Sequence, residues 1–175
     1  KKDQGFTFLV FLYICNMSTV IQPFINRLES IYDRLPIYAN KIVLENAELL
    51  IHLITENQLA KGKDSSGSIV GHYFWTTEYE HAKDPHNKPR REKITGEAYN
   101  FDWTGELFET LSIRTNANKG EFSIFSVSGK IDRLEKIYNT NLSDLTEENN
   151  NFFNLTILLP ELERIILYES VVGLI

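Results

Sequence analysis

Hydrophobic residues recur every three or four positions over two stretches near the N-terminus. Between residues 18 and 34 they place one apolar face on a helix, which Ser18 or Thr19 can cap. Pro36 is expected to interrupt this helix, because proline donates no backbone hydrogen bond and restricts the residue before it. A second, longer helix is predicted from about Tyr38 to Leu59. Its two apolar rows predict a broad face that packs on a sheet or on neighbouring helices.

The pattern changes after this helix. Residues 61–71, KGKDSSGSIVG, are rich in glycine and serine and predict a loop, with turn residues Gly62, Asp64, Gly67 and Gly71. Residues 72–82 are aromatic and β-branched, which favours an extended segment. Residues 83–96 carry two prolines and many charges. Together these segments predict an exposed arm at about residues 72–96.

Alternating residues after the arm predict a pair of strands. A short helix is expected to begin near Asp102 or Thr104, and Gly105 lies next to Thr104 at this start. The strands are expected at Ser112–Thr115 and Glu121–Val127, joined by a turn. The remainder is helical in pattern, with Thr146 as a cap and a restart at Pro160. We therefore predict an α+β fold, with long N-terminal amphipathic helices packed on a small antiparallel sheet and with C-terminal helices.

The length of 175 residues favours a single soluble domain. We expect residues 18–175 to form this domain and residues 1–17 to be an apolar leader or extension. The run Phe6–Cys15 resembles a signal-peptide core but is too short to span a bilayer. Met17 is the only methionine, so one hypothesis places the natural start there; intact-mass analysis of native material tests it. Cys15 is the only cysteine, which excludes an internal disulfide and fits a reducing compartment.

Charge is distributed unevenly around a net value of −6. Residues 83–93 hold five basic residues against two acidic ones, whereas the chain from residue 142 onward holds six acidic residues against one arginine. Opposite charges at two ends can bring copies together head to tail, and the alternative is two solvated surfaces. Aromatic residues beside the basic ones also suit contact with nucleic acid, although the overall acidity argues against binding of free DNA.

Candidate chemistry is sparse. His72, His81 and His86 lie among acidic residues, but no recognised zinc-ligand spacing appears, and exposed loop histidines are the alternative. Residues 62–68 contain glycines and hydroxyls without the order of a phosphate-binding loop, which favours a turn. Cys15 lies in an apolar run and is not a candidate nucleophile. We expect no catalytic residues, no cofactor and no metal, and hence no enzyme.

A set of features over residues 40–168 resembles small neck or tail-completion proteins of tailed bacteriophages and prophages, notably of Bacteroidales hosts. The matching features are the glycine-punctuated turn in ENQLAKGKDSSGSIVGHY, the Thr104–Gly105 pair in YNFDWTGELFETLSI, the paired strands, and the helix start in NLSDLTEENN. Trp75, residues 81–86 and residues 1–16 depart from the pattern. The order and spacing of these features carry the resemblance, since each motif is structural.

The resemblance implies a virion protein, assembled in the cytoplasm of the bacterial host, that forms a homo-oligomeric ring as head–tail connector or tail terminator. Its partners would be copies of itself and adjacent portal, connector or tail proteins, with DNA passing through the channel and no membrane. The arm would contact a neighbour, and its candidate interface residues are Tyr73, Trp75, Tyr79, Lys88, Arg90 and Arg91.

Three alternatives remain open from the residues. One is a protein-binding module without ring symmetry. Another is a metal-dependent hydrolase that uses the region of His72, His81 and His86. The third is a membrane-associated protein anchored by Phe6–Cys15. Oligomeric state, bound zinc and liposome flotation distinguish them.

Overall fold

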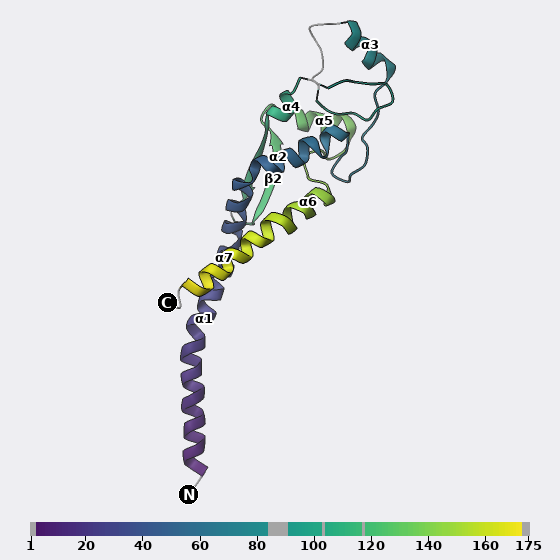
Figure 1. The fold of residues 1–175 in the computed structure, drawn as a ribbon. Helices are drawn as coiled ribbons and strands as arrows, with labels where there is room; N and C mark the ends of the chain where they lie inside the picture. The colour runs from purple at the N-terminus through teal and green to yellow at the C-terminus, as the bar shows by residue number, and fades with distance from the viewer. Residues whose placement is uncertain (1–2, 84–90, 103, 117, 173–175) are drawn as a thin grey trace.

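The structure, a computed structural model, describes residues 3–83, 91–102, 104–116 and 118–172, and of residues 3–20, 80–83 and 172 it describes the backbone alone. It confirms a mixed fold with a long N-terminal helix, a two-stranded antiparallel sheet and C-terminal helices. Helix α1 (Asp3–Glu45) extends away from the body that the other elements form (Figure 1). It runs without a break past the boundary expected between residues 17 and 18.

The break predicted at Pro36 is wrong, because α1 continues through Pro23 and Pro36 and ends only at Glu45. Helix α2 (Ala47–Glu56) begins after Asn46. Each interior proline removes a hydrogen bond, at a cost of about 3 kcal/mol. Pro36 packs beside the hairpin turn, where a Cβ added to Gly120 would lie 3.5 Å from the proline Cα. Pro36 is half-buried at this contact with the hairpin.

Strands β1 (Leu111–Asn116) and β2 (Glu121–Ser126) form the sheet as an antiparallel hairpin, close to the predicted positions. Leu111 pairs with Ser126 and Ile113 pairs with Ile124. Along β2 the more buried positions alternate with exposed ones, so that Ile124 faces the core. This is the alternation expected of a sheet with one buried face.

The C-terminal helices form a nearly continuous rod whose C-terminal end crosses α1 (Figure 1). They are α6 (Glu147–Phe153), the π-helical turn η2 (Asn154–Leu158) and α7 (Leu159–Val172). The sequence predicted that the helix restarts at Pro160. In the structure the helix widens into the π-helical turn η2 just before this proline, because proline has no N–H for the regular backbone hydrogen bonds of an α-helix. Arg34 on α1 donates to Glu169 on α7 at 2.6 Å, and this ion pair fixes the crossing.

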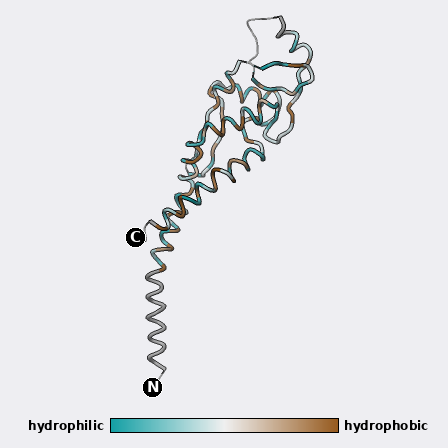
Figure 2. Tube along the Cα trace, in the orientation of Figure 1, coloured by the Kyte–Doolittle hydropathy of each residue, from teal (hydrophilic) through white to brown (hydrophobic). Residues whose placement is uncertain are grey.

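Two adjoining hydrophobic clusters hold the body together. One joins α2 to the hairpin and to helix α5 (Lys130–Tyr138), and includes Ile54, Ile124 and Ile131. The other joins α1, α2 and α6 around Phe153, which is fully buried. Where Figure 2 colours these helices, hydrophobic and hydrophilic residues are interspersed along them. The core therefore lies where the C-terminal part of α1 meets the sheet.

A buried polar side chain connects α2 to the segment before α6. Gln58 is completely buried; its amide donates to the carbonyl oxygen of Asp144 at 2.9 Å and accepts from the N–H of Thr146 at 3.0 Å. A buried amide needs such partners, since an unpaired one is costly. The short helix η1 (Leu59–Lys61) then leads into the glycine-rich loop.

Candidate interaction site at the arm

The arm is held at its base by pairing between its two ends. The N–H of Tyr73 donates to the Glu97 carbonyl at 2.9 Å, and the N–H of Gly96 donates to the Tyr73 carbonyl at 2.9 Å. The ring of Tyr73 packs edge-on against Tyr99, with centroids 4.9 Å apart. The two ends of the arm thus form one anchored base, and the arm extends from it at one end of the molecule (Figure 1).

The first part of the arm is helical. The extended segment predicted at residues 72–82 is wrong from Trp75 onward, where helix α3 (Trp75–Lys83) begins. The rings of Trp75 and Tyr79 pack one turn apart, with centroids 6.3 Å apart, and Glu78 accepts from the N–H of Thr95 at 3.0 Å. These contacts outweigh the β propensity of the sequence, which depends strongly on context. Hydrogen bonds from Thr95 also lower the pKa of Glu78.

An ion-pair network lies at the same base. The guanidinium of Arg91 donates to both oxygens of Glu56, at 2.6 and 2.7 Å, and its Nε donates to Asp102 at 3.0 Å. The hydrogen bond to Glu56 is the main cause that raises the pKa of Arg91. A planar guanidinium suits such a two-carboxylate site better than an ammonium does. Arg91 therefore connects the C-terminal segment of the arm to α2 through Glu56.

A buried lysine lies beside this network. Lys93 is 4% exposed, and its ammonium donates to Asn100 Oδ1 and, at 2.9 Å, to the carbonyl oxygen of Asp102. Burial lowers the pKa of Lys93 to about 8. The hydroxyl of Tyr73 completes the group by accepting from the Asn100 N–H at 3.0 Å. These bonds fix the backbone of residues 100–102 against the arm.

Asp102 is the acidic centre of the cluster. It is 2% exposed, and its Oδ2 accepts from Arg91 while its Oδ1 has no hydrogen-bond partner among the described residues. A buried carboxylate depends on its cationic neighbours, so removal of one partner leaves a charge that the interior cannot stabilise. The arrangement suits a fixed support for the arm, since its polar groups are mostly bonded to one another.

Two of the predicted interface residues lie at the base of the arm. Arg91 is bonded to the body and its side chain is 38% exposed, and Tyr73 is half-buried against Tyr99. Trp75 and Tyr79 are displayed, with 67% and 50% of their surfaces exposed, and so is Phe74 at 67%. The predicted residues Lys88 and Arg90 lie outside the described residues. The accessible face described here is therefore aromatic.

The predicted turn residues have structural roles around the base. Gly62 has a left-handed φ of 69°, and a Cβ at this position would lie 2.2 Å from the Tyr99 carbonyl oxygen. A Cβ on Gly71 would lie 2.5 Å from the Tyr99 ring. Both glycines are required by this close approach. Asp64 closes the turn by accepting from the N–H groups of Ser66 and Ser68, at 2.9 and 3.0 Å.

The remaining predicted caps lie near their expected positions. The short helix α4 (Glu106–Glu109) starts two residues after Thr104, whose hydroxyl accepts from the Glu106 N–H at 3.4 Å. Gly105 precedes it with a φ of 83°. Asp102 does not cap this helix, because its carboxylate faces Arg91. Thr146 is the N-cap of α6, the role predicted for it, and accepts from the Asn149 N–H.

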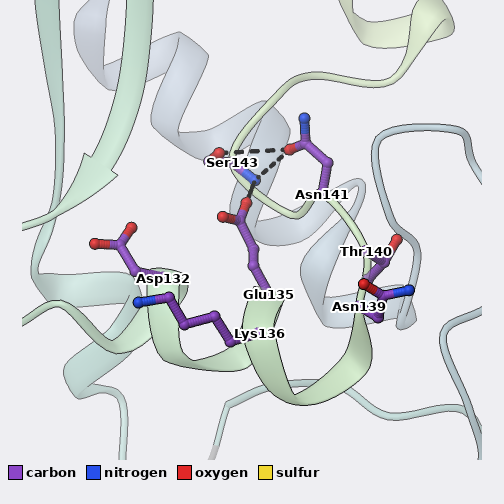
Figure 3. A pocket seen from close by; sticks show the side chains of 7 residues that line it. All are labelled: Asp132, Glu135, Lys136, Asn139, Thr140, Asn141 and Ser143. Atoms are coloured by element: carbon purple, nitrogen blue, oxygen red, sulfur yellow. Dashed lines mark hydrogen bonds between the residues drawn. The ribbon is translucent and has the colours of Figure 1, made fainter.

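An open depression of about 660 Å³ lies at the end of α5 (Figure 3). Its lining residues are Asp132, Glu135, Lys136, Asn139, Thr140, Asn141 and Ser143. One carboxylate oxygen of Glu135 accepts from the N–H groups of Leu142 and Ser143, at 2.8 and 2.9 Å, and Asn141 accepts from Ser143 (Figure 3). The polar groups here therefore hold the loop before α6.

The histidine region can be followed only in part. His72 is exposed and pairs through its backbone with Ala98. The side chains of His81 and His86 lie outside the described residues. Within the parts of the chain that the structure describes, no three His, Cys, Asp or Glu side chains group as metal ligands do.

Sequence reasoning missed the roles of Glu56, Lys93 and Asn100 at the base of the arm. Glu56 lies 35 residues from its partner Arg91, and nothing in the local pattern links the two. In the sequence Lys93 cannot be distinguished from the other charged residues of an arm that is expected to be solvated. Phe74 belongs to the same aromatic run as Trp75, and this run is the one signal that pointed to it.

In the described part of the chain, no helix has both the length and the apolar character needed to cross a membrane. Comparison of the chain with protein-family models, with curated proteins and with solved structures finds no match.

Proposed function

We propose that this chain is a structural virion protein of a tailed bacteriophage, which forms a homo-oligomeric ring in the neck and joins the portal to the tail by protein–protein contacts. The turn, the hairpin and the helix starts of this chain resemble those of neck and tail-completion proteins, and this resemblance supports the proposed place in the phage neck. The role is assembly, so the proposal assigns the protein no catalytic step. Its partners are copies of itself and the adjacent connector, portal or tail proteins.

The display of aromatic side chains at the start of α3, on Trp75 and on Phe74 just before it, is the observation that carries this proposal. Phe74 and Trp75 each expose 67% of their surface, although large aromatic residues gain most from burial. Such residues are enriched at the centres of protein interfaces. The bonded base of Arg91 and Lys93 holds them in place before any partner arrives, which lowers the entropy lost on binding.

The charge distribution of the sequence supports contact between unlike surfaces, with Lys88 and Arg90 in the arm and six acidic residues from residue 142 onward. The acidic helix α7, with Glu161 and Glu163, lies well away from the arm along the long axis of the molecule (Figure 1). A copy whose arm meets the acidic end of its neighbour forms a heterologous contact, and repetition of such a contact closes into a ring when the rotation allows it. Electrostatic attraction increases the rate of this association.

Native mass spectrometry of the purified full-length chain, together with imaging of the necks of particles that contain it, tests the proposal. We expect a closed multi-copy species, and we expect the double variant Phe74→Ala, Trp75→Ala to lose it. The control is Ile137→Ala, which truncates an apolar side chain on α5 that is 64% exposed. A monomer absent from particles, or closed rings and particle necks that survive the double variant, would contradict the proposal.

A further inference from the structure

Helix α1 carries an apolar row whose spacing alternates between three and four residues. In the described part of the helix the row consists of Ile21, Phe24, Leu28, Ile31, Leu35, Tyr38 and Ile42. In the sequence it continues toward the N-terminus through Met17, Ile14 and Val10. An apolar repeat of three and four residues is the pattern of helices that pack against each other along their length.

The two ends of this row lie in different surroundings. Ile31 and Ile42 are 3% and 2% exposed, because the C-terminal part of α1 packs in the body. Ile21, Phe24 and Leu28 are 43%, 41% and 39% exposed. This part of α1 extends past the end of α7, and none of the other described helices or strands lies beside it (Figure 1). One continuous apolar row is therefore covered at one end and uncovered at the other.

The opposite side of the helix is polar. Thr19, Asn26 and Asp33 occupy the outer position of the same repeat, and Pro23 also lies off the apolar row. Over residues 19–33 the helix is therefore amphipathic, and a helix of this kind is stabilised mainly by packing of its apolar face. Proline on the outer side leaves the apolar row uninterrupted.

The distribution of charge along α1 indicates which occupant fits. The run Phe6–Cys15 contains no charged residue, whereas Arg27, Glu29, Asp33 and Arg34 follow further along. A parallel arrangement of identical helices places apolar run against apolar run and charged turn against charged turn. An antiparallel arrangement would place the apolar run of each copy against the charged turns of the other, which is unfavourable.

We propose that the projecting part of α1 forms a parallel coiled coil with the same segment of other copies of this chain. The inference rests on the proposed homo-oligomer and names a second contact within it, separate from the aromatic face of α3. The row that packs inside the body near Ile31 and Ile42 continues as the contact between copies at Ile21, Phe24 and Leu28.

Cysteine cross-linking in the full-length chain tests this contact. In a Cys15→Ser background, Phe24→Cys places a thiol on the row, and Asn26→Cys places one on the exposed outer side two residues away. Parallel helices bring the Phe24 positions of two copies within disulfide reach, and keep the Asn26 positions apart. We expect disulfide-linked dimer for Phe24→Cys to exceed that for Asn26→Cys by about tenfold or more under mild oxidation.

The outcomes separate this inference from the proposed function. An oligomer seen by light scattering in which the two cysteine variants cross-link equally, or not at all, overturns the coiled coil and leaves the homo-oligomer standing. A monomer at all concentrations contradicts both. A chain that floats with phosphatidylcholine liposomes, and cross-links at Phe24→Cys no more than at Asn26→Cys, overturns the coiled coil in favour of a membrane surface.

Discussion

Lys93 is expected to make the stability of this protein depend on pH in a way that one substitution removes. The residue is 4% exposed in the folded chain, and burial lowers its pKa to about 8. In the unfolded chain a lysine has a pKa of about 10.4. Between these values the unfolded state binds more protons than the folded state, so the free energy of unfolding rises with pH. Below pH 8 the amine is charged in both states, and the full cost of burying the charge remains.

The magnitude follows from the two pKa values. They differ by about 2.4, and each pKa unit corresponds to about 1.4 kcal/mol, so the gain is at most about 3 kcal/mol from pH 7 to pH 10.5. Lys93→Met keeps the length of the side chain and removes the titrating group. We expect the difference in unfolding free energy, wild type minus variant, to rise by about 2 to 3 kcal/mol between pH 7.5 and pH 10.

Urea denaturation followed by far-ultraviolet circular dichroism, at a fixed protein concentration and several pH values, measures this difference. The control is Lys119→Met, since the Lys119 side chain is 65% exposed and its amine is in water in both states. A difference for Lys93→Met that stays flat with pH, or falls as pH rises, would refute the reasoning about its burial.

Two further predictions concern packing. Gly62→Ala is expected to lower the unfolding free energy by about 2 kcal/mol or more, because the new Cβ adds a clash with Tyr99 to a left-handed φ. Gly67→Ala, with a φ of 82° and no atom within 4 Å of the added Cβ, should lose only about 1 kcal/mol in the same denaturation measurement, and equal losses would contradict the clash. Phe153→Ala removes a fully buried ring and should cost about 3 to 5 kcal/mol, whereas Phe152→Ala, 47% exposed, should cost far less; thermal unfolding of the two variants compares them, and similar shifts would show that Phe153 is not a core residue.

The parts of the fold predicted best are those set by local periodicity. The hairpin follows from alternation over residues 121–126, and α5 follows from Ile131 and Leu134 on one face. The cap at Thr146 needs only the residue type and the helix after it. These features depend on neighbours in sequence, so that the pattern alone contains the information.

The candidate site was less accessible to such reasoning. Trp75 and Tyr79 stand out as aromatic residues in a polar segment, but their helical conformation depends on contacts such as that of Glu78 with Thr95. Arg91 reads as a solvated charge until the fold brings Glu56 and Asp102 beside it. A charged residue has the same appearance in sequence whether its partner is water or a distant carboxylate.

The sequence by itself determined the mixed fold class, the hairpin and the apolar row of α1, because each is a repeating pattern of side-chain type along one element. Only the tertiary structure decided that α1 continues through Pro36, that Lys93 is buried and that the row of α1 is covered at one end and uncovered at the other. The continuity of α1 and the burial of Lys93 depend on packing energy from segments far apart in the chain. That energy can offset a lost backbone bond or a desolvated charge, and it is absent from any local pattern.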